Sequence, residues 1–199
     1  MDIYFIRHGE SEGNKTKKLQ GTDNYPLTEV GVEQTIKLAE ALQNMTANVI
    51  WSSDLTRAHK TAEAVLHHQD AALITTELLR EIHLGPLQGK NREEIVREFP
   101  HLENKDLLLS GLDGAETTED ITNRCKELLA GLRKLDRDDT VLLVSHGGFI
   151  SIFLVFIIAG DKWPAVHRPF RISNTGITKL TLNDDIIAID FVNHDHHLL

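Results

Sequence analysis

The residues with the clearest chemical potential are those that follow the first apolar run. Residues 3–6 predict a short buried strand. The strand ends on Arg7, His8 and Gly9, which places a cation, an imidazole and a flexible backbone together. In open α/β sheets ligands bind at the carboxyl ends of strands, and glycine lets the backbone approach a bound group closely. The sequence therefore indicates an anion site beside a nucleophile.

Three later residues are matching partners, because each follows another predicted strand. Arg57 lies in the first turn of a predicted helix, where a basic residue opposes the helix dipole. Glu81 lies in a segment rich in glycine and proline. His146 directly follows residues 140–145, the clearest buried strand, and precedes two glycines. We expect these side chains to meet the first cluster at one edge of the sheet.

Two arginines, two histidines and one acid suit phosphate chemistry. The planar guanidinium matches phosphate oxygens in bidentate fashion. A histidine beside bound phosphate can attack phosphorus, and a carboxylic acid can protonate the leaving alkoxide and then activate water. We also expect backbone amides at Gly147 and the following helix start to donate to the phosphate. No acid-rich shell for Mg²⁺ is evident at these strand ends, so we expect no metal and no cofactor.

The order of the predicted elements indicates the fold class. Strands that alternate with helices predict an α/β fold, a three-layer α/β/α sandwich around a mainly parallel sheet. Residues 175–182 and 186–192 alternate around Asn183-Asp184-Asp185, which predicts an antiparallel hairpin at the C-terminal edge. We expect one domain over residues 1–199, with residues 91–116 as a small cover over the site.

Composition narrows the possible partners and location. The 199 residues include 30 acidic and 21 basic side chains, a formal charge of -9. This balance argues against nucleic-acid or acidic-membrane binding.

The one cysteine, Cys125, excludes an internal disulfide, and its helical pattern indicates a core position. The longest apolar run, Phe149 to Gly160, is shorter than the about 20 residues that span a bilayer, so we expect a buried helix. With no leader-like segment, we expect a cytoplasmic protein.

Four motifs in series resemble a known family. They are Arg7-His8-Gly9-Glu10-Ser11 with Asn14; Ser52-Ser53-Asp54-Leu55 with Arg57, Ala58, Thr61 and Ala62; Glu81 with Gly85 and Gly89; and Ser145-His146-Gly147-Gly148. In this order they resemble the signature of the histidine phosphatase (phosphoglycerate mutase-like) superfamily, in its phosphatase branch. Residues 173–177 also resemble a family element near the C-terminal strands.

The resemblance implies catalytic roles. His8 would be phosphorylated on Nε2 during turnover. Arg7, Arg57 and His146 would hold the phosphoryl group. Glu81 would be the proton donor and acceptor.

The resemblance also implies substrate contacts from Asn14 and from the backbone of Gln20 and Gly21. One position departs from the family pattern, since Gln88 stands where many members carry a second acid. Because Glu81 fills the acid/base position, we expect activity to survive. The departure concerns the shape of the pocket.

These observations favour a metal-independent phosphatase that hydrolyses a small phosphorylated metabolite through a phosphohistidine on His8. The mutases of this family carry a longer insertion before the second histidine, whereas the small cover here would let water reach the site. The alternatives are phosphoglycerate mutase-type phosphoryl transfer and a phospholigand-binding module without turnover. The sequence leaves the substrate and the oligomeric state open. We expect the histidines at 194, 196 and 197 to form a frayed tail rather than a metal site.

Overall fold

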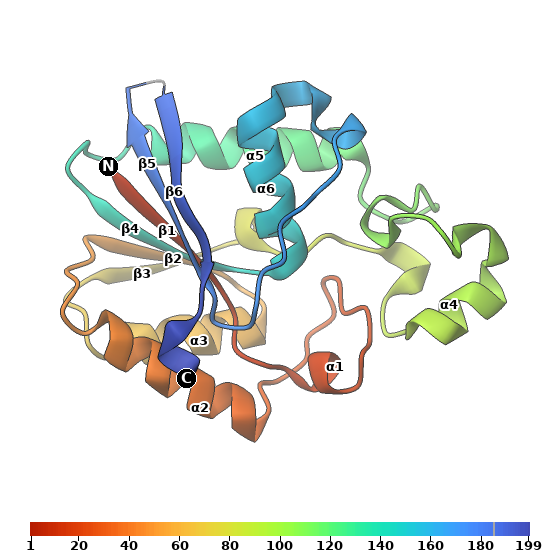
Figure 1. The fold of residues 1–199 in the computed structure, drawn as a ribbon, viewed down its shortest axis with the longest axis horizontal. Coiled ribbons are helices and arrows are strands. Elements are labelled where there is room, and N and C mark those ends of the chain that lie inside the picture. The colour runs from red at the N-terminus through yellow and green to blue at the C-terminus, as the bar shows by residue number, and fades with distance from the viewer. Residues whose placement is uncertain (185) are drawn as a thin grey trace.

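The computed structural model describes residues 1–184 and 186–199, and in these residues six strands form one central sheet (Figure 1). The strands are β1 (Asp2–Arg7), β2 (Val49–Ser53), β3 (Ala72–Thr76), β4 (Thr140–Ser145), β5 (Ile177–Asn183) and β6 (Ile186–His194). Their order across the sheet is β3-β2-β4-β1-β5-β6. Neighbours are parallel from β3 to β1, whereas β5 and β6 are antiparallel. Asp185, expected in the hairpin turn, lies outside the described residues.

The described residues contain six α-helices, four of which cover the two faces of the sheet. The helices are α1 (Glu12–Lys15), α2 (Glu29–Leu42), α3 (Thr56–Leu66), α4 (Arg92–Glu98), α5 (Thr118–Leu132) and α6 (Gly147–Ala159). In Figure 1, α5 and α6 lie above the sheet and α2 and α3 lie below it. This arrangement confirms the predicted three-layer α/β/α sandwich with an antiparallel C-terminal edge.

The central strand β4 shows why two separate cores form. Val141 and Leu143 join the apolar cluster that contains the buried residues of α5 and α6. Leu142 and Val144 join the cluster beneath α2 and α3. Successive side chains of a strand point to opposite faces, so an uninterrupted apolar run fills both cores.

The most apolar helix, α6, is a core helix. Its residues 149–156 are buried, and several of them share a cluster with Ile3 and Phe5 of β1. Together with the 3₁₀ turn that follows, Gly147–Ala165 is long and apolar enough by composition to cross a membrane, yet half of that stretch is buried within the protein. The packing confirms the expectation of a buried helix. Cys125 of α5 is also buried, as expected.

The ends of three strands are level with one another. Arg7 at the end of β1 pairs with Ser145 at the end of β4, and Ser52 of β2 pairs with Val144. The residues that directly follow β1, β2 and β4 therefore leave the sheet at one edge.

Residues 91–116 lie beyond this edge, to the right in Figure 1. They contain α4 and two 3₁₀ turns, Pro100–Leu102 and Leu107–Leu109. An isolated bridge between Leu84 and Ala115 ties the segment to the chain before it. Its role as a cover stays a prediction.

The C-terminal tail is ordered, so the expectation of a frayed terminus is wrong. Residues 196–198 form a 3₁₀ turn against α2, where Lys37 Nζ donates to the Leu198 carbonyl at 3.3 Å. His197 Nε2 lies 2.9 Å from Thr175 Oγ1. Within residues 1–184 and 186–199, no three His, Cys, Asp or Glu side chains are grouped so that they could hold a metal ion.

Candidate active site

His8 is buried at the end of β1 with one ring nitrogen free for chemistry. Its Nδ1 lies 2.6 Å from the Gly9 carbonyl, which can only accept, so the neutral ring carries its proton on Nδ1. Burial, followed by the charges of Arg7 and Arg57, holds the pKa of His8 well below its usual value. The imidazole is therefore neutral at pH 7, and its Nε2 has a lone pair suited to nucleophilic attack.

His146 lies next to His8, with 5.0 Å between the ring centroids. Its Nε2 lies 2.9 Å from the Ser53 hydroxyl, which already accepts from the Leu55 amide. Ser53 can therefore donate its proton to Nε2, which leaves the ring proton on Nδ1. That Nδ1 atom is buried and has no hydrogen-bond partner. Burial is the main cause that lowers the pKa of His146, and Arg57 adds to it.

Arg57 is fully buried and is held by the backbone of an earlier loop. Its two terminal nitrogens donate to the carbonyls of Asp23 at 2.7 Å and Gly21 at 2.8 Å. Burial lowers its pKa to about 10, which still leaves it charged at pH 7. Arg7 donates from Nη1 to the Ile172 carbonyl at 2.6 Å.

Neither arginine forms an ion pair with any residue that the structure describes, and the Nε of each is buried without a partner. Unpaired buried charge is costly, and an anion between these guanidinium groups would offset that cost. The two arginines therefore form a site for a multiply charged oxyanion.

Glu81 caps the start of α6. Its carboxylate accepts from the amides of Gly148 at 3.0 Å and Phe149 at 2.8 Å, and from its neighbour Ile82 at 3.0 Å. The expectation that this helix start donates to phosphate is therefore wrong for these two amides. The N-terminal end of a helix favours a carboxylate as it favours any anion, and this one is supplied from within the chain.

Gly147 and Gly148 lie in close contact with the side chains of Arg7 and Glu81, respectively. A Cβ at Gly148 would lie 2.6 Å from Glu81 Oε1, and one at Gly147 would lie 3.2 Å from Arg7 Nε. Glycine at these positions lets the helix approach both side chains.

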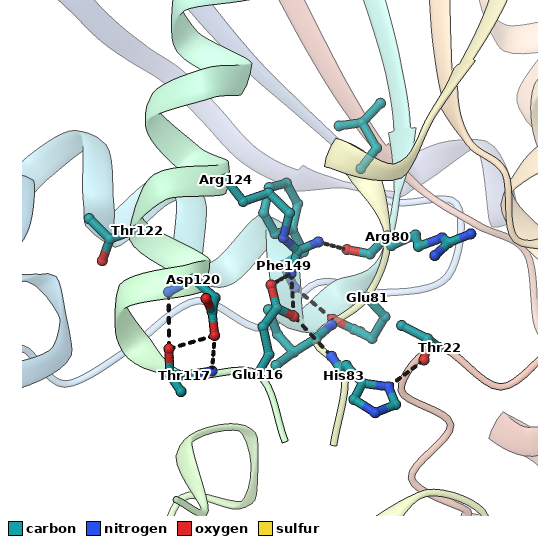
Figure 2. A network of polar contacts seen from close by, with 12 residues as sticks. Thr22, Arg80, Glu81, His83, Glu116, Thr117, Asp120, Thr122, Arg124 and Phe149 are labelled. Atoms are coloured by element: carbon teal, nitrogen blue, oxygen red, sulfur yellow. Dashed lines mark hydrogen bonds and ion pairs between the residues drawn. The ribbon is translucent and has the colours of Figure 1, made fainter. Parts of the chain in front are cut away.

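A polar network holds the backbone that carries Glu81 (Figure 2). Arg124 of α5 donates to the Arg80 carbonyl at 2.5 Å and to Glu116 at 2.9 Å, and its guanidinium lies 4.5 Å from the centroid of the Phe149 ring. Glu116 also accepts from the His83 amide at 3.0 Å. The sequence analysis missed Arg124 and Glu116, because an arginine and a glutamate near a helix give no signal of where they will pair.

Gln88 stabilises the loop that holds Arg57. Its Oε1 accepts from the Thr22 amide at 2.8 Å, and its Nε2 donates to Asp23 Oδ1 at 2.7 Å. Gly21, with a φ of +50°, leaves room for this side chain, since a Cβ there would lie 2.1 Å from Gln88 Oε1. An amide can donate to Asp23 where a carboxylate would repel it, so the departure from the family pattern has a structural function.

A loop before β5 clamps the backbone of His8. The amide of Thr175 donates to the carbonyls of Arg7 at 3.0 Å and His8 at 3.3 Å, and Asn174 Nδ2 donates to the His8 carbonyl at 3.0 Å. Thr175 has a φ of +55°, which is strained for a β-branched residue. The motif at residues 173–177 therefore orients the candidate nucleophile.

These elements enclose a cavity of about 170 Å³. Seven of the predicted residues line it: Arg7, His8, Asn14, Gln20, Gly21, Arg57 and Glu81. Lys18 and Leu19 line it as well and were not predicted. Leu84 and Leu108 also line it, in segments that the sequence places along the approach to the site. Of the predicted residues, His146 and Gly147 lie behind this lining, against His8 and Arg7 respectively.

The comparisons with known proteins agree with this geometry. The family model described as "Histidine phosphatase superfamily (branch 1)" matches residues 3–195. The chain belongs to this superfamily.

Other members of the histidine phosphatase superfamily have differing names. "Probable phosphoglycerate mutase GpmB" of Escherichia coli is 27% identical over 190 residues, which cover 94% of this chain and 87% of the relative. The structure of a mycobacterial glucosyl-3-phosphoglycerate phosphatase, complexed with VO3, is 27% identical, with a TM-score of 0.84 over 96% of this chain and 98% of the other. A phosphoglycerate mutase structure from Bacillus anthracis is 25% identical, with a TM-score of 0.82 over 100% and 95%. The chain is thus similar to phosphatases and to mutases.

Proposed function

We propose that this histidine phosphatase superfamily member hydrolyses small phosphomonoesters without a metal ion or cofactor, through a phosphohistidine on His8. The observation that carries the proposal is that the buried Arg57 and the half-buried Arg7 form no ion pair with any described residue and lie beside a neutral imidazole whose Nε2 is free. A phosphoryl group would supply the missing negative charge at the position where His8 can attack it.

In the first step, His8 Nε2 attacks phosphorus, the N–P bond forms and the ester P–O bond breaks. Glu81 gives its proton to the departing oxygen, so the alcohol leaves neutral. In the second step, water attacks phosphorus and gives its proton to Glu81, and the N–P bond breaks to release phosphate. His8 and the protonated Glu81 are thereby restored.

The other residues of the cavity stabilise the transferred group. Arg7 and Arg57, which line the cavity, would contact the phosphoryl oxygens through their guanidinium groups, and His146, which packs against His8, would help to hold the same group. Asn14 and the backbone of Gln20 and Gly21 would contact the substrate. The single acid of the cavity, Glu81, already accepts three amide hydrogens, so its oxygens are poorly available to a metal ion.

The names of several relatives favour a second candidate, phosphoglycerate mutase-type transfer. It requires that the phosphorylated His8 be protected from water until the product accepts the phosphoryl group. Residues 91–116 contribute one side chain to the cavity, Leu108, which supports hydrolysis instead. A binding module without turnover is a third candidate.

One experiment separates these functions. The protein is mixed with ³²P-labelled 4-nitrophenyl phosphate in excess EDTA and quenched in alkaline denaturant, which preserves an N–P bond. Hydrolysis predicts phosphate release and labelled wild-type protein, with neither in His8→Ala. Interconversion of 2- and 3-phosphoglycerate faster than their hydrolysis would establish a mutase. Phosphate binding with neither label nor release would establish a binding module.

A further inference from the structure

The cavity of about 170 Å³ that His8 lines is called the phosphoryl cavity below. A second, larger cavity lies beside it and shares Glu81 with it. Its volume is about 650 Å³, within the range of small-molecule sites. Glu81, His83, Glu116 and Arg124 are among the residues that line it, and Figure 2 shows how these side chains lie relative to one another. Glu81 is thus exposed to two cavities, one of which is too small for more than a phosphoryl group and a short substituent.

We infer that this second cavity receives the alcohol part of the substrate. We further infer that it selects phosphomonoesters with a neutral or cationic alcohol over those with a carboxylate or a second phosphate. The inference rests on the proposed function, and it names the substrate class for that site.

The position of Glu81 sets the direction in which the alcohol leaves. In the proposed reaction the ester oxygen leaves phosphorus on the side opposite His8 and within reach of Glu81, so the alcohol must extend past Glu81 and away from His8. The second cavity occupies a side of Glu81 that borders Thr22 and His83. These two residues are joined by a 2.6 Å hydrogen bond between Oγ1 and Nδ1, next to Gly21 of the phosphoryl cavity.

The charges around the cavity decide which alcohols fit. Five carboxylates and two arginines line it, and no lysine is among the described residues that do so. Both arginines are already paired: Arg80 with Asp54 at 2.5 Å and Glu77 at 3.1 Å, and Arg124 with Glu116 at 2.9 Å.

The negative charge that remains comes from two exposed carboxylates at the rim, Asp120 and Glu127. Hydrogen bonds from Thr117 hold the pKa of Asp120 below its usual value, so this group is ionised at neutral pH. A cleft lined by one sign of charge concentrates ligands of the opposite sign and repels those of the same sign. A phosphoglycerate-like carboxylate would meet this repulsion, whereas an ammonium or hydroxyl group would not.

The test compares matched alkyl esters: 3-aminopropyl, propyl and 2-carboxyethyl phosphate, with 4-nitrophenyl phosphate as the reference. We expect kcat/KM for the amino ester to exceed that for the carboxylate ester at least tenfold at low salt, since each exposed charge contributes about two- to fivefold. The ratio should fall in about 0.5 M salt, where exposed charges are screened.

The variant Glu127→Lys isolates the effect of the cavity from the intrinsic reactivity of the esters. It should lower the amino-to-carboxylate ratio about five- to tenfold, with kcat/KM for the propyl ester of the same variant as the internal reference. Glu119→Lys is the matched control, because Glu119 is exposed on the same helix but does not line the cavity. It should leave the ratio within twofold of the wild type.

Two outcomes would overturn the inference. If the wild type hydrolyses 4-nitrophenyl phosphate through a labelled His8 but prefers the carboxylate ester, or if Glu119→Lys and Glu127→Lys shift the ratio equally, the substrate class is wrong while the proposed function stands. If none of the four esters is hydrolysed, both fail together.

Discussion

Two regions meet at the phosphoryl cavity, and they are held in different ways. The strand-end cluster (Arg7, His8, Arg57 and His146) follows the ends of three paired strands, and three of its members are at most 2% exposed. The acid segment (residues 77–89) contains two 3₁₀ turns, and Glu81 within it is half-buried. This second region is held by the Arg124 side chain, which donates to the Arg80 carbonyl, and by two backbone amides of α6, which donate to the Glu81 carboxylate, rather than by a strand ladder.

The difference indicates how function is divided. The cluster that we propose to bind and attack phosphorus is built on the rigid sheet, which makes its geometry insensitive to surface change. Glu81, the proposed acid, is positioned by contacts from α5, α6 and a loop, each of which a single substitution can alter. We therefore expect changes in the cluster to abolish chemistry and changes around the acid segment to alter which substrates react.

The largest expected effect is from His8→Ala. Without the imidazole no N–P bond forms, so kcat for 4-nitrophenyl phosphate should fall to the background rate. The exposed His101→Ala is the matched control and should keep the wild-type rate. A His8→Ala protein that retains even 1% of the activity would contradict the nucleophilic role.

Glu81→Gln should slow the hydrolysis of alkyl phosphates more than that of aryl phosphates, which distinguishes the role of the acid segment from that of the cluster. Alkyl phosphates need a proton on the departing oxygen, so their kcat should fall about 10²–10⁴-fold. Aryl phosphates leave without that help and should slow far less. The measurement is kcat for propyl phosphate against 4-nitrophenyl phosphate. Equal slowing of both would remove Glu81 from the acid role.

Arg57→Ala should reduce kcat about 10²–10³-fold for aryl and alkyl phosphates alike, because it removes stabilisation of the phosphoryl oxygens. Arg57→Lys keeps the charge but lacks the planar guanidinium whose two terminal nitrogens reach the Asp23 and Gly21 carbonyls, and it should recover only part of the rate. A loss below tenfold in Arg57→Ala would place Arg57 outside the phosphoryl site.

Gln88→Glu should have a smaller effect, because a change in the acid segment alters the position of Arg57 in the strand-end cluster. A carboxylate there would face Asp23, loosen the loop that holds Arg57, and weaken inhibition by inorganic phosphate about tenfold. Adding Asp23→Asn removes the repulsion and should restore inhibition, which a double-mutant cycle would measure. Additive losses would show that Gln88 and Asp23 act independently.

The smallest effect at neutral pH concerns stability. Burial lowers the pKa of His8 and His146, so below about pH 6.5 the unfolded chain binds protons that the folded protein does not. As the pH is lowered below this value, the free energy of unfolding should therefore decrease by up to about 1.4 kcal/mol per pH unit for each histidine. Chemical denaturation at several pH values between 4.5 and 7.5 would measure the slope, and His146→Gln should reduce it. A slope unchanged in that variant would contradict the buried neutral state of His146.

Local patterns in the sequence were sufficient for the fold and for four residues of the cavity, whereas Asn14, Gln20 and Gly21 were expected from the family resemblance. Apolar runs and helical periods depend on which faces are buried, so they predicted the strand–helix alternation and the antiparallel edge. The strand-end rule then placed Arg7, His8, Arg57 and Glu81 in one cavity. Hydrophobic burial is a property of neighbouring residues along the chain, which is why it can be recognised without coordinates.

Only the tertiary structure decided how the polar groups are paired. It directed the amides of Gly148 and Phe149 to Glu81, joined Gln88 to Asp23, and ordered the C-terminal turn on α2. These partners lie tens of residues apart, and a hydrogen bond depends on distance and angle rather than on composition. The residue types of the site were therefore predictable from the sequence, whereas the state of each nitrogen and oxygen was determined by the packing of the completed fold.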